Sequence, residues 1–250
     1  MFFSKIGAYP AAGMFSISHL ILFLITVFLI TISLIYTVKK KKDVLKIIRI
    51  LTIIAWIIEI INIIFKFRNN GAQAINSYVP LYYCSLFLYA SILSAFCKGN
   101  LKRVGDVTVL VSGLAGGTVF LIYPSTSLTD YPAFHLVSIS SFLYHGIMTY
   151  ISVLMICTNY IKIDKKDICY YIPIVTIICI VSYTINYFTE SNLMFISSRF
   201  PYPPMDYIYD TTGKFYPLVT SLAQITLPFY FMYGVLYIVN KIRNKKEAKD

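Results

Sequence analysis

A histidine lies on a row of small polar side chains inside one of the apolar runs of this 250-residue sequence. His145 has Ser138, Ser141, Thr149 and Ser152 at spacings of three or four, so the five share one helix face. A histidine within a membrane can act as a base, a proton relay or a ligand. The alternative is that the hydroxyls pack against neighbouring helices and the imidazole is a hydrogen-bonded core group. The four polar companions favour a site.

A second polar face lies in an earlier apolar run. Glu59, Asn62 and Lys66 occur at positions i, i+3 and i+7, which places them on one side of a helix. Such groups must face protein or a water-filled cavity, because lipid cannot satisfy them. They could form a Glu–Lys pair that holds the bundle together, or they could belong to a site.

The five cysteines form no CxxC pair and show no metal-ligand spacing. Cys84 is predicted to lie about 8 Å inside a helix that begins near residue 79. A cysteine becomes a nucleophile when a base lowers its effective pKa, but an inert buried thiol is more common. Periodicity alone does not distinguish Cys84 from the other four cysteines. No HxxH or HxxxH spacing occurs, so we expect neither a metal nor a cofactor.

Three further polar residues lie near the ends or in the middle of apolar runs. His19 opens the first run, Asn186 lies near the end of the sixth, and Gln224 lies in the seventh. Pro228 removes the hydrogen bond that would reach the Gln224 carbonyl, so a kink is expected there. Together with the groups above, these residues fall in one half of the membrane or near its midplane. The sequence therefore predicts one polar cavity that opens outward or laterally.

These residues must be positioned by membrane helices. Hydrophobic residues make up 58% of the chain and charged residues only 13%, about half the usual share in a soluble protein. We expect a single transmembrane domain over 1–250, an all-α polytopic bundle of about seven helices in the cell membrane. The runs long enough to span are 18–38, 47–65, 79–96, 107–123, 134–157, 169–187 and 217–239.

Basic residues predict the orientation of this bundle. Most of the 22 Lys and Arg residues lie in 39–49, 98–103, 162–166 and 241–249, which are alternate connections and the tail. By the positive-inside rule these segments are cytoplasmic, so the N-terminus is predicted outside and the C-terminus inside. The same distribution argues against nucleic acid as the partner of this +11 chain, and membrane lipids are the expected partners. The sequence does not indicate a protein partner.

Short motifs in a fixed order add a family resemblance. The chain has SISHL opening the first helix, PLYYC opening the third, SSFLYHG in the fifth and NYF closing the sixth. It resembles YwaF-type bacterial membrane proteins over nearly its whole length. Those proteins are related to a eukaryotic multispanning acyltransferase that remodels ether phospholipids, and distantly similar to the androgen-induced membrane hydrolases. The resemblance implies a site built from Cys84 and His145. Relatives commonly carry a histidine where this chain has Tyr82.

The leading hypothesis is intramembrane acyl transfer or lipid-ester hydrolysis. Cys84 would attack an acyl ester and His145 would accept and return the proton, with Glu59 or Asn62 orienting the reactants. The alternative is a small-solute transporter or a substrate-binding membrane subunit without catalysis. Polar groups near the midplane and a proline-containing last helix suit that role, but no inverted repeat is evident.

Overall fold

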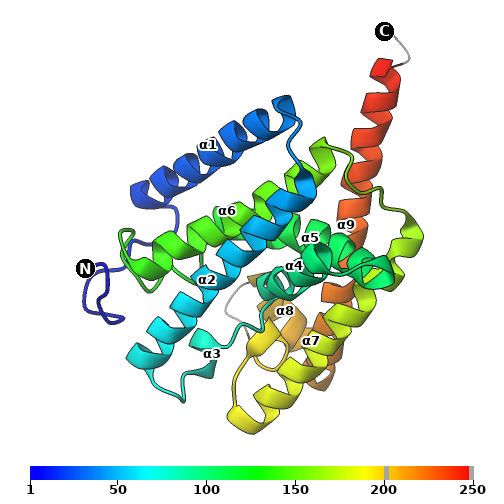
Figure 1. Ribbon diagram of the computed structural model, residues 1–250. Coiled ribbons are helices and arrows are strands. Elements are labelled where there is room, and N and C mark those ends of the chain that lie inside the picture. The colour runs from blue at the N-terminus through cyan, green and yellow to red at the C-terminus, as the bar shows by residue number, and fades with distance from the viewer. Residues whose placement is uncertain (200–202, 248–250) are drawn as a thin grey trace.

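The computed structural model describes residues 1–199 and 203–247, and within these it is a bundle of helices without strands (Figure 1). The last residues of the basic tail, 248–250, lie outside the described part. The helices are α1 (Ile17–Lys39), α2 (Val44–Asn70), α3 (Ile75–Tyr78), α4 (Leu86–Phe96), α5 (Gly99–Ile122), α6 (Leu136–Cys157), α7 (Ile168–Thr189), α8 (Pro203–Thr212) and α9 (Tyr216–Glu247). Short 3-10 turns are η1 (Tyr83–Ser85), η2 (Lys165–Asp167), η3 (Leu193–Phe195) and η4 (Gly213–Phe215).

Six of the described helices, α1, α2, α5, α6, α7 and α9, are long and apolar enough to cross a membrane. The polytopic all-α class is therefore confirmed. The expected third span differs, because the run 79–96 is helical only from Tyr83 to Phe96. Fourteen helical residues cover about 21 Å at most, against a hydrocarbon core of about 30 Å.

A proline explains the late start of this third helix. Pro80 disfavours helical geometry at the preceding residue, and Val79 is extended, with φ −79° and ψ 119°. Tyr82 is extended as well, with φ −118° and ψ 170°. Cys84 consequently lies in the 3-10 turn that opens the helix, and not 8 Å inside it.

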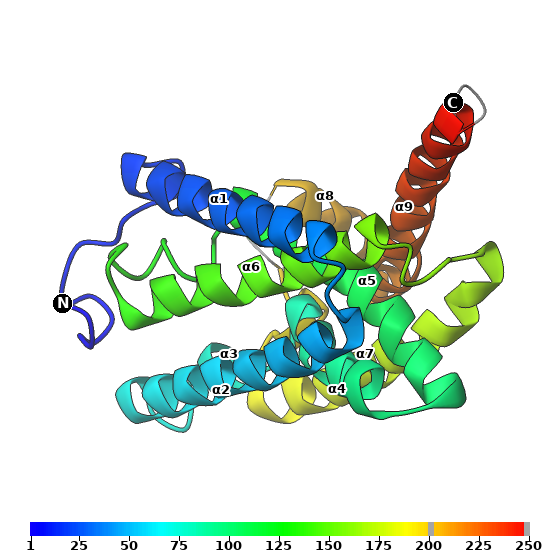
Figure 2. The same cartoon turned by 45° about the horizontal axis from the view of Figure 1, so that its top comes forward.

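α5 and α6 form the centre of the bundle. Their most apolar stretches are 67% and 72% buried, whereas that of α1 is only 6% buried. α5 packs mainly on α4 and α6, and α6 also contacts α1 and α2. Figure 2 shows α6 between α1 and α2. Because α6 is packed against α1, α2 and α5, most of its polar side chains, among them Ser138, His145 and Ser152, are buried in protein.

Small residues on α5 allow this close packing. A Cβ at Gly105 would lie 2.7 Å from the carbonyl carbon of Leu93 and 2.8 Å from the Ala90 carbonyl oxygen, both backbone atoms of α4. A Cβ at Gly117 would lie 3.0 Å from the His145 carbonyl oxygen on α6. The glycines of α5 therefore set the distance between the helices that carry Cys84 and His145.

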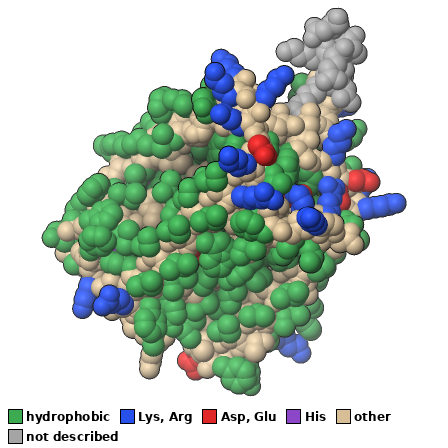
Figure 3. Space-filling view, in the orientation of Figure 1, with side chains coloured by type: hydrophobic (Ala, Val, Ile, Leu, Met, Phe, Trp, Pro, Cys, Tyr) green, Lys and Arg blue, Asp and Glu red, His purple; other side chains and the backbone are tan. Residues whose placement is uncertain are grey.

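The basic connections meet at one end of the bundle. Arg49 of α2 donates to the carbonyl of Ala95 at the end of α4. Arg103 of α5 forms an ion pair with Asp167 of η2 and donates to the Lys162 carbonyl. Figure 3 shows Lys and Arg side chains gathered at the end from which the C-terminus projects, with hydrophobic side chains over most of the remaining face. Which side of a membrane this end faces stays a prediction of the positive-inside rule.

Candidate functional site

A cavity of about 710 Å³ lies between α2, η1, α5, α6, η3, α8 and α9. Five of the residues proposed from the sequence line it: Glu59, Asn62, Cys84, His145 and Gln224. They come from four separate elements: Glu59 and Asn62 from α2, Cys84 from η1, His145 from α6 and Gln224 from α9. Most of the wall is apolar, so the cavity combines a small polar region with space for a hydrocarbon chain.

The backbone of Cys84 is fixed by contacts with α5 and α6. The hydroxyl of Tyr144 donates to the Cys84 carbonyl at 2.9 Å. A Cβ at Gly116 of α5 would lie 3.6 Å from the Cβ of Cys84, so the glycine leaves room for the cysteine at this point. Cys84 lines the cavity and is partly buried. Its backbone is therefore positioned by α5 and α6 at the wall of the cavity.

The imidazole of His145 is held in one tautomer. Its Nδ1 lies 2.7 Å from the carbonyl oxygen of Ser141, which can only accept, so Nδ1 carries the proton. The ring of Phe120 stacks on the imidazole with centroids 3.7 Å apart and an angle of 10°. Nε2 is left as a proton acceptor. In the described part of the chain no hydrogen bond joins this ring to the Cys84 thiol. Catalytic hydrogen bonds often form only when substrate is bound.

Glu59 and Lys66 both line the cavity without forming an ion pair with each other. Neither has a hydrogen-bond partner among the described residues. Asn62, on the same face of α2, is buried and accepts a hydrogen bond from the Ser140 hydroxyl at 2.8 Å. The pair that could have held the bundle together is thus absent from the described structure. A carboxylate and an ammonium group remain available to a ligand.

Gln224 contributes an unpartnered acceptor. Its side-chain nitrogen donates to the Met194 carbonyl at 2.8 Å, while its buried Oε1 has no partner in the structure. The expected free carbonyl before Pro228 is partly satisfied, because the Tyr171 hydroxyl lies 3.4 Å from the Gln224 carbonyl oxygen. The unsatisfied acceptor at the cavity wall is therefore the buried side-chain oxygen of Gln224 and not its backbone carbonyl.

His19 and Asn186 lie away from the cavity lining. Both ring nitrogens of His19 bind backbone: Nε2 lies 2.9 Å from the Leu121 carbonyl oxygen, and Nδ1 accepts from the Phe15 amide at 3.1 Å. Asn186 organises the loop around η3, where its side chain bonds the amide and carbonyl of Leu193. Both residues hold segments in place, and Asn186 acts on the cavity indirectly because η3 supplies part of its wall.

The polar side chains predicted on one face of α6 have two different surroundings: some bind backbone carbonyls at packing contacts, and others line the cavity. Ser138 donates to the Pro132 carbonyl, Thr149 to the His145 carbonyl, and Ser152 to the carbonyls of Val109 and Met148. Of the row, only Ser141 and His145 line the cavity. Most of the hydroxyls therefore serve packing, whereas His145 is a hydrogen-bonded, buried group that also lines the cavity.

Lys66 and Tyr144 are two cavity residues that were not named as candidate site residues. For Lys66 the sequence left a structural ion pair with Glu59 and a role in a site both open, and its position on the same helix face as Glu59 was a usable signal. Tyr144 precedes His145 in the chain, yet its contact with the Cys84 carbonyl depends on tertiary structure. No group of three or more metal-ligating side chains occurs within the described residues.

The family of the chain follows from a comparison of its sequence. The profile of the TMEM164 family, a transmembrane family, matches residues 14–235. The chain belongs to the TMEM164 family. The matched region contains every cavity residue from Glu59 to Pro228 and leaves out only Ile6 of the N-terminal segment. No curated protein and no solved structure is significantly similar to the chain.

Proposed function

We propose that this TMEM164-family protein transfers or hydrolyses a lipid acyl group inside the membrane, with Cys84 as nucleophile and His145 as base. The observation that carries the proposal is the state of His145. Its Nδ1 is occupied by the Ser141 carbonyl, and its Nε2 is a free acceptor in the cavity that also exposes Cys84. An imidazole with one nitrogen oriented by a hydrogen bond and the other free, in the same cavity as a thiol, offers the groups that nucleophilic catalysis uses.

The reaction proceeds in two balanced halves. The Cys84 proton passes to Nε2 of His145, the thiolate attacks the acyl carbonyl carbon, and the ester C–O bond breaks. The departing alkoxide takes the proton from His145 and leaves a thioester on Cys84. An acceptor hydroxyl or water then gives its proton to His145 and attacks the thioester, and the Cys84 thiolate takes the proton back. The identity of the acceptor decides between transfer and hydrolysis.

The walls of the cavity suit a lipid substrate. Val119 of α5 and Leu227 of α9 line the cavity and are also 63% and 66% exposed, so the cavity reaches the lipid-facing surface between these helices. An acyl chain can therefore enter without crossing water. Lys66 supplies a positive charge for an anionic part of the substrate, and Glu59 can orient a hydroxyl of the acceptor.

Covalent labelling tests the proposal. The full-length protein in phosphatidylcholine nanodiscs is treated with a long-chain electrophile that reacts with thiolates, and the labelled cysteine is identified by mass spectrometry. We expect labelling at Cys84 that disappears in Cys84→Ala and falls strongly in His145→Ala. Cys157→Ala and Cys169→Ala serve as controls, because these two thiols are exposed on the outside of the bundle.

Two results would overturn the proposal. Labelling confined to Cys157 and Cys169 would show that Cys84 is inert. Labelling of Cys84 that His145→Ala leaves unchanged would show that the histidine is not its base. An inert Cys84 combined with saturable binding of a small solute would instead support a transporter or a substrate-binding subunit.

A further inference from the structure

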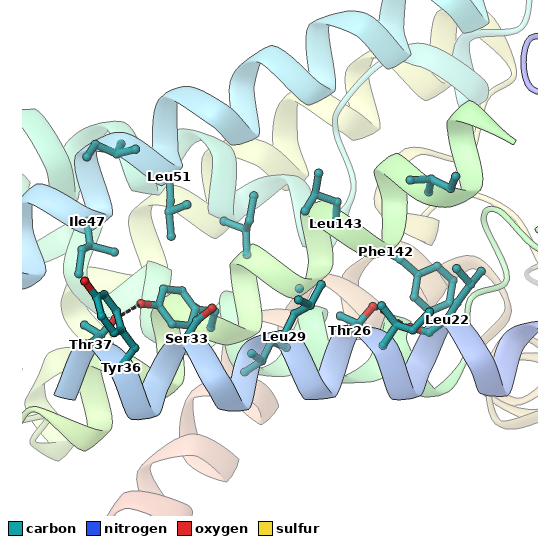
Figure 4. A pocket seen from close by; sticks show the side chains of 17 residues that line it. Leu22, Thr26, Leu29, Ser33, Tyr36, Thr37, Ile47, Leu51, Phe142 and Leu143 are labelled. Carbon is teal, nitrogen blue, oxygen red and sulfur yellow. Dashed lines mark hydrogen bonds between the residues drawn. The ribbon is translucent and has the colours of Figure 1, made fainter. Parts of the chain in front are cut away.

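A second hollow lies on the opposite side of α6 from the cavity. It is a groove of about 540 Å³ between α1 and α2, with α6 as its floor. Figure 4 shows it running along α1 from Leu22 to Thr37. This stretch of helix corresponds to about 24 Å, which is most of the thickness of one bilayer core. The groove is thus long and narrow, and it lies within the membrane-spanning part of the bundle.

The interior of this groove offers almost no free polar group. The Thr26 hydroxyl donates to the Leu22 carbonyl of its own helix at 2.8 Å. Thr37 and Tyr150 share a hydrogen bond between their hydroxyls at 2.7 Å. Both bonds are drawn in Figure 4. Among the described lining residues, the hydroxyls of Ser33 and of the exposed Tyr36 have no hydrogen-bond partner. The matching occupant is therefore a hydrocarbon chain.

The groove is open toward the surrounding lipid. α1 packs principally on α6, and the lining residues Ile25, Leu29 and Ile50 are each about half exposed. Within a bilayer, apolar surface of this kind is covered by acyl chains. A groove differs from a flat helix face because it surrounds a chain on three sides and so can retain one lipid in preference to its neighbours.

One end of the groove carries positive charge that is not neutralised. Lys39, Lys40, Lys41, Lys42 and Lys46 connect α1 to α2, and none forms an ion pair within the described residues. Lys42 Nζ lies 5.6 Å from the ring centroid of Tyr36, a lining residue, so this ammonium group sits at the mouth. The nearby carboxylate of Asp43 is used as the α2 N-cap, where it accepts from the Lys46 amide.

We propose that this groove, with the lysines at its mouth, is a binding site for an anionic glycerophospholipid. One acyl chain lies along α1 between Leu22 and Thr37, and the phosphate lies against Lys42 and Lys46. A basic cluster beside an apolar crevice between membrane helices recognises the headgroup and chain of the same lipid together. A second copy of the protein fits less well, because it would bring two unneutralised lysine clusters together.

Lipid retention measured by mass spectrometry tests this site. The full-length protein in mild detergent is mixed with equal amounts of phosphatidylglycerol and phosphatidylcholine that carry identical chains, and the retained lipids are counted by native mass spectrometry. We expect one retained phosphatidylglycerol per protein, preferred about tenfold or more over phosphatidylcholine.

Two pairs of variants test the binding of the acyl chain and the binding of the headgroup separately. Ser33→Phe fills the groove and should abolish retention of this lipid, whereas Thr31→Phe, on the same helix but outside the groove, should not. Lys42→Gln with Lys46→Gln should remove the preference for phosphatidylglycerol. Lys162→Gln with Lys166→Gln removes the same charge from another basic connection and should leave the preference intact.

Any one of three outcomes would overturn the proposal. The first is retention of phosphatidylglycerol by Ser33→Phe at the wild-type level, and the second is an unchanged preference for phosphatidylglycerol in the Lys42/Lys46 variant. A dimer in nanodiscs that dissociates in Ser33→Phe would place a second copy in the groove. Labelling of Cys84, measured on the same variants, reports separately on the cavity.

Discussion

The two hollows on either side of α6 differ in what their polar atoms bind. In the cavity, Glu59, Lys66 and the Nε2 of His145 have no hydrogen-bond partner among the described residues. In the groove, the hydroxyls of Thr37 and Tyr150 bind each other. Burying unsatisfied polar groups is costly, so their concentration on one side marks the place where a ligand has to supply the missing partners. Satisfied hydroxyls beside apolar side chains indicate a surface that accommodates hydrocarbon.

The largest expected difference in acyl-transfer rate is between variants of two histidines, His145 and His19. We predict that His145→Ala lowers acyl transfer by about 100- to 10,000-fold, because the general base is lost. His19→Gln should leave the rate per folded molecule unchanged, since both nitrogens of His19 bind backbone outside the cavity. Initial rates with a lipid ester, divided by the folded fraction from gel filtration, measure both. Equal losses of rate in the two variants would contradict the assignment of His145 to the catalytic site and of His19 to a structural role.

A pair of cations on α2 gives the next largest effect. Lys66→Met should lower kcat/KM for an anionic lipid substrate by roughly tenfold to a hundredfold, the value of a charge-assisted hydrogen bond. Arg68, two residues later, is exposed and does not line the cavity, so Arg68→Met serves as the matched control. Kinetics with anionic and uncharged substrates measure the effect. A loss that is identical for both substrates would contradict a role for Lys66 in charge recognition.

Substitutions of glycines at different helix–helix contacts should lower the stability of the protein to different degrees. Gly105→Ala places a methyl group against α4 backbone and should destabilise the protein by about 1–3 kcal/mol. Gly146→Ala meets only the Thr26 methyl group, at 2.9 Å, on the peripheral helix α1, so its cost should be smaller. Gly234→Ala has open space and should be neutral or slightly stabilising. Thermal unfolding in detergent ranks the three, and the reverse order for Gly105 and Gly146 would contradict the packing described.

The smallest effect concerns the N-terminal segment, whose Ile6 lines the cavity and not the groove. His135 accepts the Val137 amide on Nδ1 and binds the Ser4 carbonyl through Nε2. Burial lowers the pKa of His135 below its usual value near 6.5, so the folded state favours the neutral ring. Its contribution to stability is present above that pH and is lost as the pH falls. The hydrogen-exchange protection factors of residues 1–16, corrected for the intrinsic exchange rate at each pH, should therefore fall as the pH is lowered from 7.5 to 5.5, and His135→Gln should remove this dependence.

The fold was predictable to the extent that it depends on composition and local pattern. Long apolar runs predicted the membrane helices, and six of them are long enough to span in the structure. The third predicted helix begins later in the structure than in the prediction, because hydrophobicity alone does not locate the start of a helix. Pro80 and the extended residues around it delay the helix to Tyr83 and put Cys84 in a 3-10 turn.

The candidate site was predictable only in part. Helical spacing correctly placed Glu59, Asn62 and Lys66 on one face, and this face lines the cavity. Helical spacing could not show that the side chains of His19 and Asn186 bind backbone groups. Their partners, Leu121 and Leu193, lie in other elements or loops. Nor could it show that the hydroxyls of α6 serve mainly for packing against α5.

The sequence by itself determined that the chain is a polytopic helical membrane protein and which of its residues are costly to bury. Both properties depend on transfer from water to lipid and on helical periodicity, which act residue by residue. Tertiary structure alone decided which costly residues share a cavity. Periodicity defines the face of a helix but not the helix it meets, and here the close approach of α4, α5 and α6 at glycines brings Tyr144 to Cys84 and leaves His145 facing the same space.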